Sequence, residues 1–137
     1  MITPALDTPE RAIVSVVNTE RARHGLRALR PSGALSRAAA THTADMLRVG
    51  SLTHTASGGS SFGARLGAFG SWTRTGEALA FSNRRSARAR SFLRIWLRSP
   101  AHRTLLLDGS FSKVGVGREK GRIGGLRGTV VTLDLAS

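Results

Sequence analysis

The stretch IWLRSPAHRTLLLDGSFSKVGVG, residues 95–117, contains the change of hydrophobic period that decides the fold. Its first part continues a helical pattern, because apolar residues between Ala89 and Leu97 recur at helical spacing and arginines occupy outward positions. Proline cannot extend the hydrogen bonding of a helix, so this helix is predicted to stop at Pro100. From Lys113 onward, apolar residues alternate with other residues, which is typical of a strand. The stretch therefore predicts helices before strands.

Two further helices are predicted nearer the N-terminus. Thr8, Pro9 and Glu10 supply a capping hydroxyl, a proline for the first helical position and an acid for the first turn. Gly25 is expected to end this helix, as Gly50 ends the next one. The second helix has an apolar stripe at helical spacing that comprises Leu35, Ala38, Ala39, His42, Met46 and Val49. Residues 51–76 are rich in Ser, Thr and Gly and predict a long loop with a short helical fragment at 61–70.

The C-terminal third predicts a pair of strands. KVGVGR at 113–118 and GTVVTLDLA at 128–136 alternate, and the glycine-rich segment between them suits a hairpin connection. We expect the two strands to pair antiparallel beneath the helices. The fold class is therefore α+β, with helices covering a central antiparallel sheet. A chain of 137 residues forms one core, so residues 1–137 are expected to be a single, monomeric domain.

The composition limits the classes of partner. The formal net charge is +13, and nearly all basic residues are arginines. Such a surface favours anionic partners, either nucleic acid or the polymers and phospholipids of a cell envelope. The arginines are scattered, and neither tyrosine nor a basic–aromatic alternation of the RNA-binding type is present, which argues against nucleic acid. The absence of cysteine excludes disulfides and thiolate metal sites.

Membrane and targeting signals are also absent from the sequence pattern. No stretch reaches the roughly 20 apolar residues of a membrane-spanning helix. Residues 1–12 have neither the basic region nor the apolar region of a secretory signal.

The histidines and one acid are the candidates for a site. His24 precedes a helix-ending glycine, and His42 lies in an apolar stripe, so both are expected to be structural. His54 and His102 are predicted in polar loops just past helix ends, where scaffolds often present reactive groups. Glu77 stands between a glycine and an apolar run, which predicts partial burial and hence a partner. Two imidazoles and a carboxylate can bind a divalent metal or carry out acid–base chemistry.

In order, the segments VVNTERARHGLRAL, LSRAAATHTADML, SLTHT, FGARLGAFG, TGEALA, IWLRSPAHRTLLLDGSFSKVGVG and VVTLDLA resemble the bacterial branch of the CAP superfamily. This superfamily comprises cysteine-rich secretory proteins, antigen 5 and pathogenesis-related 1 proteins, and is also described as SCP-like or allergen V5/Tpx-1-like. The resemblance extends from about Glu10 to Ala136. It implies a three-layer α-β-α sandwich, an extracellular or cell-envelope location, and a surface cleft lined by two histidines and two acids. The matching positions here are His54, Glu77 and His102.

The sequence departs from the family pattern at three positions. Many animal and plant members have a second glutamate three residues after the tryptophan that corresponds to Trp96, and this chain has Ser99 there. The usual asparagines of the GEN and HRxN segments are replaced by Ala78 and Leu105. The expected set of two histidines and two acids is therefore incomplete.

These observations leave several functions open. The resemblance favours a domain that binds a small molecule, a lipid or an envelope component in a cleft containing His54, Glu77, His102, Ser99 and Arg103. Within it, His54 and His102 are the candidate ligands of Zn²⁺ or another divalent metal. No catalytic residue is assigned, although Glu77 would activate water in the alternative function of a metal-assisted, peptidase-like hydrolase.

Two other functions are weaker alternatives. Ser99 would be the nucleophile of a serine hydrolase with His102 as its base, but a serine at this position is more typical of a helix cap. A nucleic-acid binder driven by charge alone would show a steep loss of affinity with salt.

Overall fold

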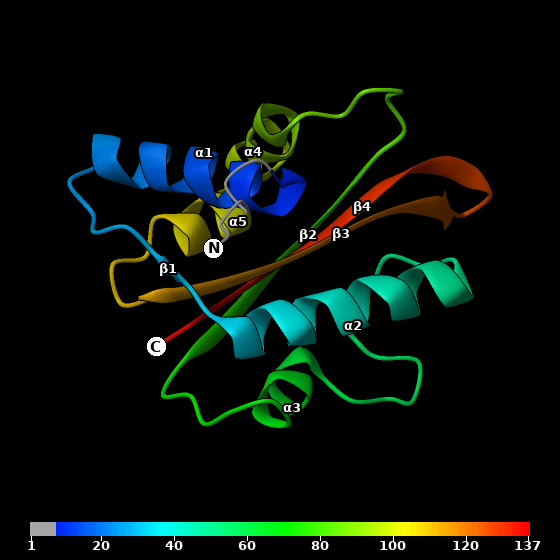
Figure 1. The fold of residues 1–137 in the computed structure, drawn as a ribbon, viewed down its shortest axis with the longest axis horizontal. Coiled ribbons are helices and arrows are strands. Elements are labelled where there is room, and N and C mark those ends of the chain that lie inside the picture. The colour runs from blue at the N-terminus through cyan, green and yellow to red at the C-terminus, as the bar shows by residue number, and fades with distance from the viewer. Residues whose placement is uncertain (1–7) are drawn as a thin grey trace, which may run out of the picture.

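The computed structural model describes residues 8–137, which contain a four-stranded sheet with helices on both faces (Figure 1). In chain order the elements are α1 (Pro9–Arg23), β1 (Arg30–Pro31), α2 (Gly33–Val49), α3 (Phe62–Gly67), β2 (Thr75–Ser82), α4 (Ala89–Leu97), α5 (Pro100–Leu106), β3 (Lys113–Ile123) and β4 (Leu126–Ala136). In Figure 1, α1, α4 and α5 lie on one side of the sheet, and α2 and α3 lie on the other. The predicted α-β-α sandwich is confirmed.

The strand order is β1-β3-β4-β2. β3 pairs antiparallel with β4 over its whole length, and β2 pairs antiparallel with the other edge of β4. The predicted pairing of the two C-terminal strands is thus confirmed. At one edge of this sheet, the short strand β1, which was not predicted, pairs parallel with β3.

The hairpin between β3 and β4 is tighter than the sequence predicted. Ile123 and Leu126 are register partners, so only Gly124 and Gly125 form the turn. Their φ angles of 56° and 84° lie in the left-handed region, which favours glycine in such two-residue turns. Most of the segment expected to be a connection is therefore strand.

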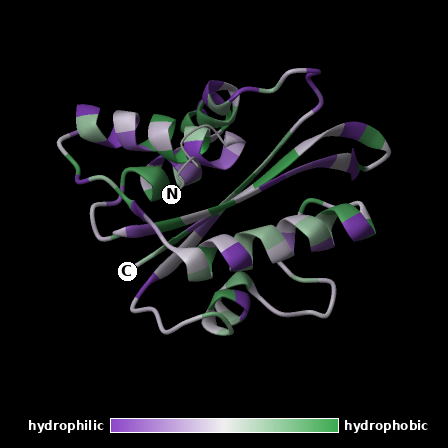
Figure 2. Ribbon diagram, viewed as in Figure 1, coloured by the Kyte–Doolittle hydropathy of each residue, from purple (hydrophilic) through white to green (hydrophobic). Residues whose placement is uncertain are grey.

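Two hydrophobic layers hold the helices to the sheet. The larger one joins Ile13 and Val17 of α1, and Phe92 and Trp96 of α4, to the strand residue Leu133 and its neighbours. On the opposite face, α2 lies so close to β3 that a Cβ at Gly117 would stand 2.5 Å from the Ala39 carbonyl oxygen. This close approach brings the residues of α2 next to the inner strands (Figure 2).

The segment around Pro100 corrects one prediction. α4 does end before Pro100, but the proline then begins α5, and the Ser99 side chain caps that helix. Proline suits the first helical position because its missing N–H would have no helical partner there. His102, which was expected in a loop, therefore lies in the first turn of a helix. His54 does lie in the loop between α2 and α3, as predicted.

Candidate functional site

His54 and Glu77 form the centre of the candidate site. Glu77 belongs to β2, where its side chain is fully buried, and His54 belongs to the loop between α2 and α3, where its side chain remains 47% exposed. The Nδ1 atom of His54 lies 2.8 Å from Oε1 of Glu77. Because a carboxylate oxygen accepts, Nδ1 is the donor in this contact, and Nε2 is left for another partner. The ring of Phe62, 5.8 Å away between centroids, flanks the imidazole.

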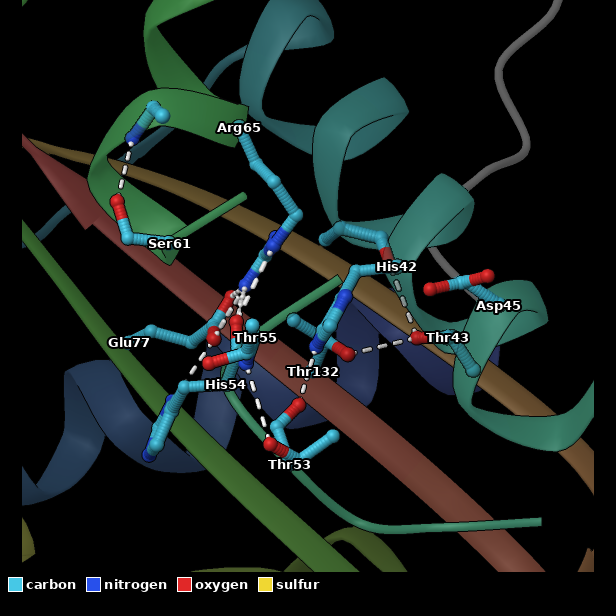
Figure 3. A network of polar contacts seen from close by, with 12 residues as sticks. His42, Thr43, Asp45, Thr53, His54, Thr55, Ser61, Arg65, Glu77 and Thr132 are labelled. Atoms are coloured by element: carbon cyan, nitrogen blue, oxygen red, sulfur yellow. Dashed lines mark hydrogen bonds and ion pairs between the residues drawn. The ribbon is translucent and has the colours of Figure 1, made fainter. Parts of the chain in front are cut away.

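Arg65 of α3 ties this pair together (Figure 3). Its Nη2 donates to both carboxylate oxygens of Glu77, at 2.7 and 2.8 Å, and to the backbone carbonyl of His54 at 2.8 Å. One guanidinium thus neutralises the buried carboxylate and fixes the loop that carries the histidine. Arg65 was not predicted as a site residue, because nothing in the sequence of its glycine-rich helical fragment indicates that it pairs with Glu77.

A second buried acid, Asp134 of β4, lies beside Glu77. The two residues are register partners on adjacent strands, and Asp134 is 0% exposed. Among residues 8–137, no N–H or hydroxyl group hydrogen-bonds to its carboxyl oxygens. Burial, followed by the contact with the Glu77 carboxylate, raises the pKa of Asp134 well above its usual value. A protonated Asp134 would be able to donate its hydrogen to Glu77, which agrees with the raised pKa of Asp134 and the lowered pKa of Glu77.

Glu77 keeps its charge in spite of being buried. Burial alone would raise the pKa of Glu77, but hydrogen bonds from His54, Asp134 and Arg65 outweigh this cost and lower the pKa to about 2. A carboxylate with so low a pKa is a weak base. Its position suits the orientation of His54 better than the removal of a proton from water.

His102 completes the set of imidazoles. It is partly buried in the first turn of α5, and its Nδ1 is buried without a hydrogen-bond partner among the described residues. Burial lowers the pKa of His102, and the nearby His54 lowers it further. The structure thus brings His54, Glu77 and His102 into one neighbourhood.

The other two residues predicted for the cleft have simpler surroundings. The Ser99 hydroxyl accepts a hydrogen bond from the backbone N–H of His102 at 3.5 Å, so Ser99 is a helix cap. Arg103 is exposed on α5. As a helix cap, Ser99 lacks the adjacent base that activates a serine nucleophile.

His42 is a core residue, as predicted. It is 1% exposed, and its Nε2 donates to the Thr53 carbonyl oxygen at 2.6 Å. The contact fixes the start of the loop just before His54. Burial lowers the pKa of His42, which keeps the ring neutral. A cavity of about 320 Å³ next to this network is lined by His42, Asp45, Arg65 and Phe69, among others.

Few side chains near His54 are available to bind a metal ion. No cluster of three or more His, Asp or Glu side chains suited to a metal is present within residues 8–137. Glu77 is committed to Arg65, which leaves the imidazoles of His54 and His102 as the available donors. A carboxylate that orients an imidazole, as Glu77 orients His54, is a feature of histidine-ligated metal sites, whereas the Nδ1 of His102 has no such partner among the described residues. Two imidazoles are fewer than the three protein ligands of a catalytic zinc site, so an ion held there would need further ligands from solvent or from a bound molecule.

The chain is similar to a known protein family and to several solved structures. The model of the cysteine-rich secretory protein family, CAP, matches residues 14–134. No curated protein matches the chain. Among solved structures, an extracellular protein with an SCP domain from Bacillus anthracis is 24% identical with a TM-score of 0.79, and the match covers 93% of this chain and 40% of that one.

Two further structures have the same fold. An outer surface protein from Borrelia burgdorferi is 20% identical with a TM-score of 0.74, over 92% of this chain and 90% of that one. A cysteine-rich secretory protein from Staphylococcus aureus is 15% identical with a TM-score of 0.68, over all of this chain and 42% of that one. This chain thus spans less than half of the Bacillus and Staphylococcus proteins. Because the family model covers most of its length, the chain belongs to the cysteine-rich secretory protein (CAP) family.

Proposed function

We propose that this chain is an extracellular or envelope-associated CAP domain that binds a ligand through the imidazoles of His54 and His102. A divalent ion such as Zn²⁺ is the simplest ligand of this kind, and a small molecule, a lipid or an envelope component with a group that hydrogen-bonds to imidazole is the alternative. The location rests on the relatives, two of which are described as an extracellular and an outer surface protein. In residues 8–137, no helix is long and apolar enough to cross a bilayer.

The observation that carries the proposal is the contact between Nδ1 of His54 and Oε1 of Glu77 at 2.8 Å. A carboxylate that accepts from one ring nitrogen fixes the tautomer and makes the other nitrogen a better ligand. Burial lowers the pKa of His102, and His54 is near enough to lower it further, which supports a site that the two rings share. A bound divalent ion would supply Lewis-acid polarisation of whatever group coordinates it.

The geometry favours binding over hydrolysis. A metal-assisted hydrolase needs a base that faces the water it activates, whereas the Glu77 side chain is fully buried and its pKa lies at about 2. The role of Glu77 as an orienting group requires no proton transfer.

The test is titration calorimetry with Zn²⁺ on the wild type, His54→Ala, His102→Ala and the control His24→Ala. His24 is an exposed histidine that caps α1, far from Glu77 along the sequence. We expect either site variant to weaken zinc binding about tenfold or more, and His24→Ala to leave it unchanged. Affinity should also fall between about pH 7.5 and 5.5, because protons compete for imidazole near its usual pKa of about 6.5. Equal binding by all four proteins would contradict the metal site.

A further inference from the structure

The hairpin end of the sheet contains a second, larger cavity that has no connection with His54. It has a volume of about 500 Å³ and lies between the β3–β4 hairpin and the loop that follows β2. In Figure 2, both segments contain strongly hydrophilic stretches, and the hairpin also has hydrophobic colour near its turn. We call this cavity the hairpin pocket. Its lining includes Asn83, Arg84, Arg85, Lys120, Arg127 and Thr129.

The hairpin pocket forms where the helix layer ends. Along β3, side chains at even positions face α1 and α4: Val116 packs in the main core, and Arg118 stacks on Phe92 and donates to the Ala87 carbonyl oxygen. Lys120 is the next residue on this face and is exposed, because it lies past the last turn covered by α4. Its register partner is Thr129, so the lysine and the hydroxyl stand side by side on one surface.

The four cations of the hairpin pocket lack acidic partners. In residues 8–137 the arginines that form ion pairs are Arg23, Arg48, Arg65 and Arg74, none of which lines this pocket. Glu119 is the nearest acid in sequence, but its register partner Val130 packs toward Met46 of α2 on the opposite face. The positive charges of the pocket are therefore not neutralised by the protein.

The hairpin also places like charges opposite each other. Arg122 and Arg127 are direct register partners, an arrangement that destabilises an antiparallel pair unless something neutralises it. Arg122 donates to the Gly125 carbonyl oxygen at 3.0 Å, which directs its guanidinium to the turn. Arg127 remains in the pocket with Lys120 and the two loop arginines.

We propose that the hairpin pocket binds a compact polyanion that carries at least two phosphate groups, of the pyrophosphate or tripolyphosphate kind. Guanidinium groups bind phosphate oxygens in pairs, and Asn83 and Thr129 add uncharged donors. Four cations around one cavity exceed the charge of a single phosphate. The volume of the pocket is in the range of small-ligand sites. A flat membrane surface would not require such a concave pocket.

The experiment measures tripolyphosphate, pyrophosphate and inorganic phosphate binding by titration calorimetry at constant ionic strength. The test variant is Arg84→Gln/Arg127→Gln, and the control is Arg27→Gln/Arg37→Gln. Both remove two positive charges, and the control arginines are exposed, outside the pocket and in no ion pair within residues 8–137. We expect the test variant to bind tripolyphosphate at least about tenfold more weakly, because it loses charge-assisted hydrogen bonds. The control should bind within about twofold of the wild type.

Two further probes separate the sources of phosphate. Single-stranded DNA and phosphatidylglycerol vesicles present phosphodiesters on a polymer and on a bilayer. The proposal requires that tripolyphosphate bind the wild type more tightly than inorganic phosphate and compete with any binding of these probes. It is overturned if both double variants lose affinity equally, because the effect would then be net charge alone. It is also overturned if DNA or vesicles bind through Arg84 and Arg127 while tripolyphosphate does not bind.

Discussion

Replacing Asp134 with Asn should stabilise the protein, and the gain should grow with pH. Asp134 is fully buried opposite Glu77, and its raised pKa means that it keeps its proton to a higher pH in the folded state than in the unfolded chain. In the unfolded chain the same carboxyl loses its proton above its usual value of 3.8. Above that pH the folded protein must therefore bind a proton that the unfolded chain has released. Asparagine has the same shape, carries no proton to lose, and has an amide N–H that is able to donate to Glu77 as a protonated carboxyl would.

The magnitude follows from proton linkage. Where the folded state binds one more proton than the unfolded state, stability falls by about 1.4 kcal/mol for each pH unit. The difference between Asp134→Asn and the wild type should thus widen by about 1.4 kcal/mol per unit, for as long as the native Asp134 keeps its proton. The sign is opposite for Glu77, whose lowered pKa stabilises the fold above 4.5 and loses this effect as the pH falls toward about 2. The comparison therefore begins above pH 4.5, where Glu77 is charged in both proteins.

Urea denaturation followed by the fluorescence of the buried Trp96 measures this difference at a series of pH values. Asp45→Asn is the matched control. Hydrogen bonds from Ser57, both backbone and side chain, and from Arg48 lower the pKa of Asp45 to about 2, so its loss should destabilise the protein at neutral pH. A pH-independent loss of stability in Asp134→Asn would refute the argument, because it would mean that Asp134 is ionised and paired in the native state.

Two other substitutions test the packing. Gly117→Ala should destabilise the protein by about 3 kcal/mol or more, since the new Cβ would meet the backbone of Ala39, whereas Gly121→Ala meets only the end of the Leu47 side chain and should cost less; equal losses in thermal unfolding would contradict this explanation. His42→Ala should cost about 2–3 kcal/mol through the lost hydrogen bond to Thr53 and the cavity it leaves, without changing zinc affinity; unchanged stability with lost zinc binding would show that His42 is a ligand.

The predicted helices and the hairpin follow from local signals. Thr8 and Gly50 cap helices as their positions in the sequence indicate, and the alternation from Lys113 onward forms β3. β2 was not predicted, because almost all of its residues are buried and the sequence therefore lacks the alternation of a half-exposed strand. α5 was not predicted because a proline that ends one helix is equally suited to begin another.

The site was only partly predictable for a related reason. The neighbourhood of His54, Glu77 and His102 came from the family resemblance, since their sequence separations contain no metal-binding pattern. Arg65 and Asp134 depend on the placement of α3 and on the register of β2 against β4. A signal for Asp134 did exist, because an acid inside an apolar strand requires a partner when it is buried. Without β2 in the prediction, that partner was not identifiable.

The missing glutamate at position 99 has a consequence for the charge of the site. The family pattern places a second acid near the histidines, whereas in this chain the second acid is Asp134, which lies beside Glu77 and whose pKa is raised by burial and by the Glu77 carboxylate. The remaining carboxylate is neutralised by Arg65. With neutral imidazoles, the site has no net negative charge to attract a divalent cation, so zinc binding through His54 and His102 should be weak. The lack of negative charge would not weaken the binding of an uncharged or anionic ligand. Tight zinc binding by the wild type would contradict this argument, because it would show that Glu77 can leave Arg65 to coordinate the metal.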